Sequence, residues 1–360
     1  MPEIKVVQYV EDLKIGGIEK IISYIALGLR NEYDIEVWCI VKRGQIAEEL
    51  EDAGISIREV RNIFELLKEI NRTKPDIIHM HGISARMWGR AVGLLFPRIK
   101  KIIHIHTLFD KHLNKWNLFK ESVLGKFTNR VIAGCRAVKN AYMDSTGVPG
   151  DKVEVVYNSS PEFPAYDNKE IVKLKQDLGI NDEIIICFWG RLVKIKGVQY
   201  LLRAGKYLKN ENIKILIIGD GPYKSDLEDI ICKEGINEKV VFTGMRNDID
   251  KLSCLVDIYV QPSILRESVP LSLSEAASRG IPLIATDIGG NSEIVIDGVN
   301  GYLVHPEDEN IIAEKIRILI KDANRRKQMG DEARKIYENK FALKIMLDGI
   351  KAIYNGIYKI

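Results

Sequence analysis

The sequence predicts an α/β protein made of two doubly wound domains, each with a parallel sheet covered by helices on both faces. Three observations support this prediction. The chain has 360 residues, which is too long for one hydrophobic core and suits two domains. Short, β-rich apolar runs alternate with helical stretches throughout. A stretch with two prolines near the middle interrupts this alternation, which then starts again.

In the first half, six apolar runs have the length and composition of strands. Between the first two, residues 18–31 have the spacing of an amphipathic helix. Strands that are apolar on both sides indicate a parallel sheet covered on both faces. The predicted strands lie at 4–10, 34–41, 76–81, 101–106, 130–134 and 152–158.

The stretch 158–168, NSSPEFPAYDN, is the predicted linker, because prolines, serines and acidic residues interrupt regular elements there. We therefore place the first domain at 1–160. Further strands are predicted at 183–190, 213–221, 239–244, 257–263 and 281–287, with helices near 197–209, 222–234, 271–279 and 309–320 and a charged helical stretch at 324–360. We expect the two domains to face each other across a cleft, with ligands beyond the carboxyl ends of the strands.

The composition excludes several classes of protein. A net charge of +3 does not mark a nucleic-acid-binding protein, and 46% hydrophobic residues is ordinary for a folded soluble chain. The first ten residues read as a strand and not as a secretion signal, and no apolar run approaches the ~18 residues of a membrane span. The five cysteines are scattered without a C-x-x-C pair, which argues against a zinc cluster or a disulfide framework.

The segment after the strand at 183–190 reads G-R-L-V-K-I-K-G. Gly190 allows a sharp exit from the strand, and Arg191 and Lys196 then precede a helix near Gly197. Two cations beside a helix N-terminus form an anion site, and a diphosphate would suit it. A solvated basic loop is the alternative. In the next loop, GDGP, Gly219 and Gly221 allow a tight turn, although a plain strand–helix connection also explains it.

Two carboxylates lie eight positions apart further along the chain. Glu267 follows the strand at 257–263, and Glu275 lies inside the next predicted helix. A carboxylate accepts two hydrogen bonds and suits neighbouring hydroxyl groups such as those of a ribose. The pair therefore predicts a clamp for a hydroxylated molecule with an anion between its ends, although exposed helix glutamates are also common. Gly289 and Gly290 follow the next strand, where backbone amides could face a phosphate.

In the first half, Gly17 follows the first strand directly, so the backbone there can approach a ligand closely. The strands at 76–81 and 101–106 each carry two histidines at positions i and i+2. We expect the members of each pair to point to opposite faces of the sheet, and therefore predict no metal site. His106, the last of the four, is best placed to face a cleft, and packing explains the others.

These motifs, taken together, resemble those of a known family. Gly-Gly-x-Glu after the first strand, G-R-L-x-x-x-K-G, GDGP, and E-x7-E followed by Gly-Gly occur in this order across nearly the whole chain. The chain resembles the retaining glycosyltransferases of family 4. The resemblance implies the GT-B fold, with two Rossmann-like domains: an acceptor domain at 1–160, a nucleotide-sugar donor domain at 161–340, and a C-terminal helix at 341–360 that returns to the first domain.

The resemblance also implies roles for individual residues. Arg191 and Lys196 would hold the diphosphate of a UDP- or GDP-sugar, Glu275 the ribose, and Glu267 and His106 the donor sugar. Glu267, Arg191, Lys196 and His106 are thus the predicted catalytic residues, and Gly17, Gly190, Gly219, Gly221, Glu275, Ser268, Val269, Pro270 and Leu271 are predicted to bind the donor. No metal or other cofactor is expected.

The implied reaction is a front-face transfer with retention of configuration. The bond to the leaving diphosphate loosens first, the acceptor hydroxyl attacks on the same side, and the phosphate takes its proton. Catalysis then consists mainly of charge stabilisation and positioning. The family's frequent Glu-Gly is here Glu267-Ser268, which leaves the identity of the sugar open, and its frequent Asn-Gly is here Asn158-Ser159.

The segment 86–130 carries ten lysines and arginines against two acidic residues, a local charge of +8, with Trp88, Phe96, Trp116 and Phe119 interleaved. Such a surface suits anionic lipid headgroups or a lipid-linked diphosphate acceptor. The residues predicted to contact the acceptor or a membrane are Arg98, Lys100, Lys101, Lys111, Lys115 and Trp116. Aromatic residues turned into the core are the alternative, and no recognition motif for nucleic acid accompanies the charge.

The predicted function is therefore transfer of a sugar from a nucleotide-sugar to a lipid-linked or polysaccharide glycan in cell-envelope synthesis. The predicted location is the cytoplasm, with contact to the inner face of the plasma membrane. Two alternatives remain open: a sugar-nucleotide 2-epimerase with the same architecture, and a non-catalytic nucleotide-sugar-binding partner subunit.

Overall fold

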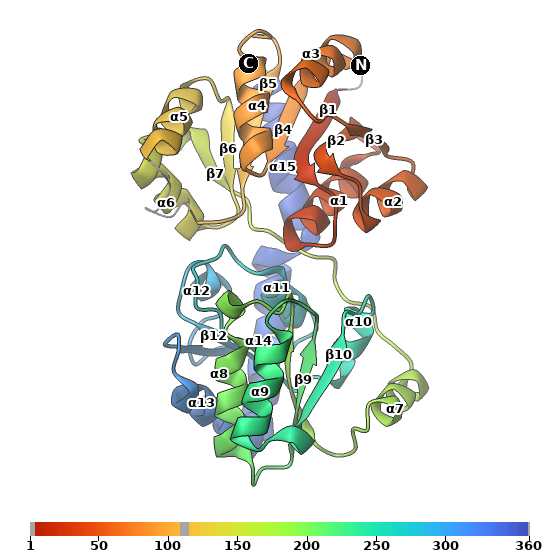
Figure 1. Cartoon of the computed structure of the whole chain (residues 1–360), viewed down its shortest axis with the longest axis vertical. Coiled ribbons are helices and arrows are strands. Elements are labelled where there is room, and N and C mark those ends of the chain that lie inside the picture. The colour runs from red at the N-terminus through yellow and green to blue at the C-terminus, as the bar shows by residue number, and fades with distance from the viewer. Residues whose placement is uncertain (1–3, 109–114, 359–360) are drawn as a thin grey trace. The chain divides into compact units, whose positions relative to one another are not determined.

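A computed structural model of the chain describes residues 4–108 and 115–358. The chain forms two compact units: the first comprises residues 1–160 and 343–360, and the second comprises residues 161–342. Each unit contains one parallel sheet with helices packed on it (Figure 1). The prediction of two doubly wound α/β domains is therefore confirmed. Among the described residues, no helix combines the length and apolar character needed to cross a membrane.

The sheet of the first unit has seven parallel strands in the order β3-β2-β1-β4-β5-β6-β7. Its elements are β1 (Lys5–Asp12), α1 (Gly17–Leu29), β2 (Asp34–Lys42), α2 (Gln45–Asp52), β3 (Ser56–Glu59), α3 (Ile63–Thr73), β4 (Ile77–His81), α4 (Ile83–Gly93), β5 (Lys100–Ile105), α5 (Lys115–Lys126), β6 (Arg130–Ala133), α6 (Arg136–Thr146), β7 (Val153–Val155) and α15 (Leu343–Tyr358). The strand order reverses direction between β1 and β4, which places the carboxyl ends of these two strands side by side.

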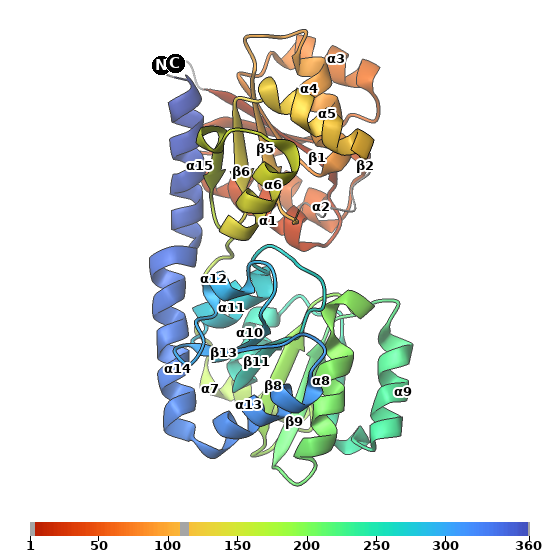
Figure 2. The same cartoon turned by 90° about the vertical axis from the view of Figure 1, so that its left-hand side faces the viewer.

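The C-terminal helix α15 belongs to the first unit, as predicted. It packs beside α1 and lies on the opposite side of the sheet from α3, α4 and α5 (Figure 2). The ring of Tyr354 meets that of Tyr33 edge to face, with the centroids 5.4 Å apart, and Tyr33 Oη donates to Asn355 Oδ1 at 3.0 Å. Because Tyr354 is fully buried, α15 is part of the core of this unit and not an appendage.

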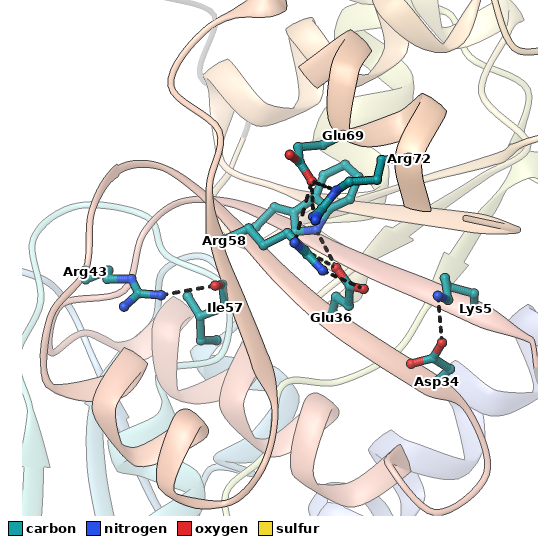
Figure 3. A network of polar contacts seen from close by, with 9 residues as sticks. Lys5, Asp34, Glu36, Arg43, Ile57, Arg58, Glu69 and Arg72 are labelled. Carbon is teal, nitrogen blue, oxygen red and sulfur yellow. Dashed lines mark hydrogen bonds and ion pairs between the residues drawn. The ribbon is translucent and has the colours of Figure 1, made fainter. Parts of the chain in front are cut away.

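A polar network fastens the outer strands of this sheet to helix α3 (Figure 3). Arg58 on β3 donates to Glu36 on β2 at 2.6 Å and lies 3.8 Å from Glu69 on α3. Burial alone would raise the pKa of Glu36. The hydrogen bonds from Arg58 and Trp38 lower the pKa by more than burial raises it, so the net shift is downward and the carboxylate stays ionised. The network thus ties together three elements at the edge of the sheet.

The second unit has a six-stranded parallel sheet in the order β10-β9-β8-β11-β12-β13. Its elements are α7 (Asn168–Asp177), β8 (Ile184–Trp189), α8 (Val198–Gly205), β9 (Ile213–Ile218), α9 (Lys224–Glu234), β10 (Val240–Gly244), α10 (Ile249–Leu252), β11 (Ile258–Gln261), α11 (Leu271–Ser278), β12 (Leu283–Thr286), α12 (Asn291–Ile294), β13 (Gly301–Val304), α13 (Glu309–Lys321) and α14 (Ala323–Ile336). Apolar residues of β8, β9 and β11 pack against α8, α9 and α13 to form its core.

Two strands were not predicted, namely β3 and β13. Both are four residues long and form an edge of a sheet, so each has a neighbour on one side only. The stretch 324–360, predicted as helical, is interrupted at Ala342, whose backbone is extended (φ −64°, ψ 142°). The chain passes from the second unit to the first at this point.

Candidate functional site

The second sheet reverses its strand order between β8 and β11. From β8 the chain continues outward to β9 and β10, and from β11 it continues the other way to β12 and β13. The loops that follow β8 and β11 therefore leave the sheet from neighbouring strands and diverge. Such a point is where open α/β sheets bind ligands, and it contains both Lys196 and Glu267.

Glycines let the loop after β8 pack against the loop after β9. Gly219 has φ +138°, and a Cβ atom there would overlap the carbonyl oxygen of Gly190. Gly221 stands in the same relation to the carbonyl of Leu192, whose amide donates to Asp220 O at 2.9 Å. The predicted donor-binding glycines Gly219 and Gly221 thus hold the β8 loop in position by close contact of backbone with backbone.

Lys196 ends a short 3-10 turn, η2 (Lys194–Lys196), and Gly197 follows it with φ +71°. A Cβ atom on Gly197 would overlap the carbonyl oxygen of Pro262, and Ile264 N donates to Ile195 O at 2.9 Å. The loops after β8 and β11 are therefore in direct contact, which places Lys196 beside the residues that follow β11.

Lys196 Nζ lies 2.7 Å from Glu267 Oε2 across these two loops. Both side chains are about one fifth exposed, with 21% and 22% of their surface accessible. Glu267 also accepts through its carbonyl from Gly290 N at 2.9 Å, so that the loop after β12 joins the same cluster. The Gly290 amide therefore already donates to a carbonyl within the protein. The expectation that this amide faces a phosphate is wrong.

Arg191 is exposed directly after Gly190, and no ion-pair partner for its side chain is found among residues 4–108 and 115–358. The two predicted phosphate-binding cations thus differ in their surroundings. Lys196 is neutralised by Glu267, whereas Arg191 is available to an incoming anion. An anion that binds here would compete with Glu267 for the ammonium group of Lys196.

Glu275 lies on α11, 5% exposed, and accepts a hydrogen bond from Trp189 Nε1 at 2.8 Å. Trp189 is the last residue of β8, and its ring lies 4.1 Å from that of Tyr259 on β11. The tryptophan thus orients the predicted ribose-binding carboxylate. Sequence reasoning missed Trp189, although its place at the end of a strand beside Gly190 is a signal for it.

A chain of polar side chains that the sequence did not predict links the end of β11 to the start of α11. Tyr259 Oη and Ser272 Oγ both donate to Gln261 Oε1, at 2.8 and 3.0 Å, and Gln261 Nε2 donates to Ser263 Oγ at 2.8 Å. The polar residue Gln261 at the end of an apolar strand is the sequence signal. This chain fixes the start of the β11 loop.

The residues between Glu267 and α11 include a buried hydroxyl without a partner. Ser268 is 4% exposed, and no hydrogen bond to its Oγ is found within the described part of the chain. Val269 is 2% exposed, whereas Pro270 and Leu271 are half-buried at the start of α11. The serine that replaces the family's frequent glycine thus adds an unpaired polar group beside Glu267.

In the first unit, the predicted orientation of the histidines is wrong. Successive side chains of a strand alternate, so that residues i and i+2 share a face and do not oppose each other. His79 and His81 on β4 have ring centroids 4.3 Å apart, and His104 and His106 at the end of β5 stack at 4.0 Å. The four histidines form one buried cluster.

Burial keeps this cluster neutral. It lowers the pKa of His79 and of His106 to about 3, and it lowers the pKa of His81 and His104 in the same direction. One ring nitrogen of each of His79, His81 and His104 lies within 4.8 Å of the others, a spacing that could hold a metal. However, His81 already uses Nε2 with Gln8 and Nδ1 with His106, which leaves only two rings with a free nitrogen.

Gly17 opens helix α1 and is exposed. At the neighbouring strand end, Glu11 accepts from Ser84 N at 2.6 Å, so that a β1 carboxylate caps the N-terminus of α4. The prediction that Gly17 lets the backbone approach a ligand closely stays a prediction.

The basic segment 86–130 divides into a buried and an exposed part. Arg90, fully buried, donates to Glu121 Oε2 at 2.6 Å, and Arg86 lies 3.5 Å from the same carboxylate. Lys101 is 6% exposed and donates to the carbonyls of Gly93 and Ile99. The surface role predicted for Lys101 is therefore wrong, because its ammonium group closes the end of α4 in the interior.

The exposed part consists of apolar side chains on α5 and beside it. Trp116 and Phe119 are 59% and 57% exposed and stack on each other at 5.7 Å, with Lys120 Nζ 5.3 Å from the Trp116 ring. Arg98 is exposed and Lys100 half-buried, whereas Lys111 and the side chain of Lys115 lie outside the described residues. The aromatic residues Trp116 and Phe119 are thus not turned into the core.

Two family models together match most of the chain. The model described as Glycosyltransferase Family 4 matches residues 15–159, and the one described as Glycosyl transferases group 1 matches residues 170–336. An uncharacterised glycosyltransferase of Methanocaldococcus jannaschii is 32% identical over 96% of this chain and 95% of its own length. The UDP-Gal:α-D-GlcNAc-diphosphoundecaprenol α-1,3-galactosyltransferase of Escherichia coli is 26% identical over 94% of each chain.

Solved structures match the whole fold. The chain superposes on Anabaena HepE in complex with UDP with a TM-score of 0.91 at 23% identity, covering 98% of this chain and all of that one. HepE in complex with UDP-glucose gives a TM-score of 0.87, also at 23% identity, over 99% of this chain and all of that one. At this identity the likeness is one of fold.

Proposed function

The chain belongs to glycosyltransferase family 4, and from this premise we propose that it is a retaining enzyme that moves a sugar from a UDP- or GDP-sugar to a hydroxyl group of a lipid-linked or polysaccharide glycan. The observation that carries this proposal is the pair of Lys196 and Glu267 at the strand-order reversal of the second sheet. The cell envelope is the proposed setting, and the predicted cytoplasmic location stays a prediction.

The geometry of the second unit supports these roles chemically. A donor diphosphate would draw Lys196 away from Glu267 and add Arg191, so that two cations would meet the charge that develops on the leaving group. The released Glu267 carboxylate could then accept hydrogen bonds from sugar hydroxyls. Glu275, held by Trp189, is a preset acceptor for ribose hydroxyls.

We also propose that this transfer needs no metal. The diphosphate charge is met by Arg191 and Lys196. The strongest candidate ligands in the described part of the chain are His79, His81 and His104, and the titratable groups that shift their pKa values are other histidines and Arg86, with no carboxylate among them. A divalent ion would be costly there, because nothing offsets its charge. Full activity in the presence of a chelator is the expected result.

The experiment that tests the function measures nucleotide release from UDP-, GDP-, ADP- and dTDP-sugars, with and without a lipid extract. We expect one donor to be consumed only when acceptor is present, with retention of the anomeric configuration in the product. Lys196→Ala should lower kcat by about a hundredfold or more, as loss of a charge-stabilising group does. Lys194→Ala removes an exposed lysine of the same turn and is the matched control.

Other outcomes identify the alternatives. Interconversion of the donor sugar without any acceptor would identify a 2-epimerase. Nucleotide binding that Lys196→Ala weakens, without turnover of any donor, would identify a non-catalytic binding subunit. Either result would contradict the proposed transferase.

We further propose that the first unit contacts an anionic membrane through a surface that we call the α5 stripe, formed by Trp116, Phe119, Val123 and Phe127. These side chains are 38–59% exposed. Spacings of three and four residues place them on one face of the helix and its end. The opposite side carries Glu121, buried against Arg86 and Arg90.

The helix α5 therefore has the reverse of the usual arrangement, with its acidic residue Glu121 inside and its aromatic residues Trp116 and Phe119 outside. Lys120 and Lys126 adjoin the α5 stripe on the same helix. Arg98, five residues after the end of α4, is also exposed. Apolar side chains that enter the headgroup region, flanked by lysines that meet anionic lipid, form a recognised mode of peripheral binding. It would bring the enzyme to a lipid-linked acceptor.

Cosedimentation with vesicles of phosphatidylglycerol and phosphatidylcholine tests this proposal. Replacing Trp116 and Phe119 by alanine should weaken vesicle binding at least tenfold, since burial of one aromatic side chain contributes about 1.5–3 kcal/mol. Phe64→Ala removes an 82% exposed phenylalanine of α3 and is the control. Failure of the wild type to bind vesicles at low salt would refute the proposal.

A further inference from the structure

We propose that Glu267 is a specificity-determining residue through which the donor site distinguishes an intact nucleotide-sugar from a free nucleoside diphosphate. Its carboxylate competes with the diphosphate for the ammonium group of Lys196, and the hydroxyl groups of a sugar compensate the carboxylate when it loses that contact. A nucleoside diphosphate without a sugar offers no such compensation and binds more weakly. The identity of the ligands rests on the proposed function, whereas the ion pair is a feature of the structure.

The ion pair is fully formed without any ligand. Lys196 Nζ lies 2.7 Å from Glu267 Oε2, and only 21% and 22% of the two side chains are exposed. Solvent and salt therefore screen the contact less than they screen an ion pair on the open surface. An ammonium group that a carboxylate already neutralises attracts a phosphate less strongly than a free one does. Glu267 thus lowers the affinity of the site for every anion that reaches Lys196.

Backbone hydrogen bonds hold both partners of the ion pair in place. Ile264 N donates to Ile195 O at 2.9 Å, which joins the loop after β11 to the turn that ends at Lys196. Gly290 N donates to Glu267 O, also at 2.9 Å, which joins the same loop to the one after β12. The carboxylate therefore stays in position when a ligand draws the ammonium group away, and the ion pair re-forms when that ligand leaves.

Neighbouring cations do not take over the role of Lys196. Arg191 is exposed on the loop after β8 and is the second cation proposed to meet the diphosphate. Arg266 precedes Glu267 in the chain and is exposed, and no ion pair between these two residues is found within 4–108 and 115–358. A partly buried carboxylate that loses its charged partner must find hydrogen-bond donors or bear a cost in free energy.

A nucleoside diphosphate and a nucleotide-sugar differ in what they offer to this carboxylate. The phosphates of either ligand meet Arg191 and Lys196, and the ribose of either ligand meets Glu275. Only the nucleotide-sugar adds hydroxyl groups that donate hydrogen bonds to Glu267, and bonds from a hydroxyl to an ionised carboxylate are strong. The sugar and the diphosphate therefore bind cooperatively, because the sugar supplies the partner that the diphosphate removes.

The same coupling favours release of the product after transfer. The sugar leaves with the acceptor, and Glu267 then lacks its hydroxyl partners while Lys196 still contacts the diphosphate. Return of Lys196 to Glu267 compensates the carboxylate and weakens the hold on the nucleoside diphosphate. The ion pair thus opposes inhibition by this product without opposing binding of the donor.

Calorimetry with UDP and GDP tests the proposal without any turnover. Glu267→Gln frees the ammonium group of Lys196 and should bind one of these nucleoside diphosphates roughly three- to tenfold more tightly than the wild type, the order of the contribution of one ion pair. A merely structural role of Glu267 would weaken binding or leave it unchanged. Glu170→Gln removes an exposed carboxylate of α7 that pairs with Lys251 at 2.8 Å, and it should leave the Kd unchanged.

A double-mutant cycle separates the ion pair from general repulsion between carboxylate and phosphate. In a Lys196→Ala background, Glu267→Gln should tighten nucleoside diphosphate binding by less than about twofold, because screened repulsion alone remains. A gain of equal size in both backgrounds would overturn the proposal. So would a Glu267→Gln variant that binds UDP and GDP no more tightly than the wild type.

A panel of UDP- and GDP-sugars provides the second readout. The wild type should bind its best nucleotide-sugar more tightly than the corresponding nucleoside diphosphate, and Glu267→Gln should lose most of this preference. An unchanged ratio of the two Kd values in Glu267→Gln would contradict the coupling. If the cycle shows the coupling but no donor is consumed with any acceptor, the role of the ion pair stands and the proposed transferase function fails.

Discussion

Removal of the carboxylate of Glu121 should destabilise the first unit strongly. Glu121 is 3% exposed and serves two cations, Arg90 at 2.6 Å and Arg86 at 3.5 Å. Glu121→Gln keeps the shape of the side chain but leaves two buried guanidinium groups without a counter-charge. Breaking a buried ion pair in this way costs about 3–5 kcal/mol.

The ratio of two arginines to one glutamate, Arg86 and Arg90 with Glu121, allows a sharper prediction. Arg90→Met leaves Arg86 with Glu121 as a balanced pair, so it should cost less than Glu121→Gln, although both remove the same 2.6 Å contact. Glu154→Gln removes a half-exposed carboxylate that pairs with Arg130 at 3.1 Å, and it should cost less than about 1 kcal/mol.

Hydrogen exchange followed by mass spectrometry measures the effect within one unit. Amides of β4 and β5 that exchange through opening of the whole unit should exchange roughly 100- to several-thousand-fold faster in Glu121→Gln. Peptides from β8 and β11 in the second unit serve as an internal reference. A loss of protection below about tenfold, or a larger effect of Arg90→Met than of Glu121→Gln, would refute the reasoning.

Three further predictions follow from the site and from the histidine cluster. Gly197→Ala should abolish most donor turnover, because Cβ would overlap the Pro262 carbonyl; Gly298→Ala, also at positive φ (+73°) but in open space, should retain activity in the same assay. Trp189→Phe should raise the Kd of the nucleotide several-fold by calorimetry, since Glu275 loses its indole partner; an unchanged Kd would mean that the bond does not orient the carboxylate. Acidification from pH 7 to 5 should lower the free energy of unfolding by roughly 2 kcal/mol for each of His79 and His106, because below about pH 6.5 the unfolded chain binds protons that the folded rings, with pKa about 3, do not. Urea titrations at both pH values measure this loss, and His305→Gln, at an exposed histidine, should leave the slope unchanged.

The fold was predictable where strands are buried on both sides. The runs that became β1, β4, β8 and β9 are apolar and long enough to stand out from their surroundings. The edge strands β3 and β13 were missed because four residues with a neighbour on one side carry little periodicity.

In the second unit, the spacing of Glu267 and Glu275 after a strand singled out two carboxylates, and their role as site residues stays a prediction. Their partners Lys196 and Trp189 lie 71 and 86 positions away in the sequence, and no local pattern encodes such contacts.

Charge in the sequence was a poor guide to the surface of the first unit. Three cations of the basic segment lie in the interior, namely Lys101, Arg86 and Arg90. Backbone carbonyls accept hydrogen bonds from Lys101, and Glu121 pairs with the two arginines. Whether a lysine is buried depends on the carbonyls around it, and these come from the tertiary fold. The histidines were misplaced for a simpler reason, since the two-residue period of a strand already puts each pair on one face.

The membership of α15 in the first unit has a consequence for the order in which the protein matures on the ribosome. The first unit is interrupted by the whole of the second, residues 161–342, so its last helix is translated 182 residues after its last strand-bearing segment ends. At about 5–20 residues per second, this is a delay of roughly 10–35 seconds. During that time Gln8 and His79 lack the hydroxyl group of Tyr354. The face of the first unit against which Met346, Ile350 and Ile353 later pack is also uncovered, and chaperones have access to it until the final helix arrives.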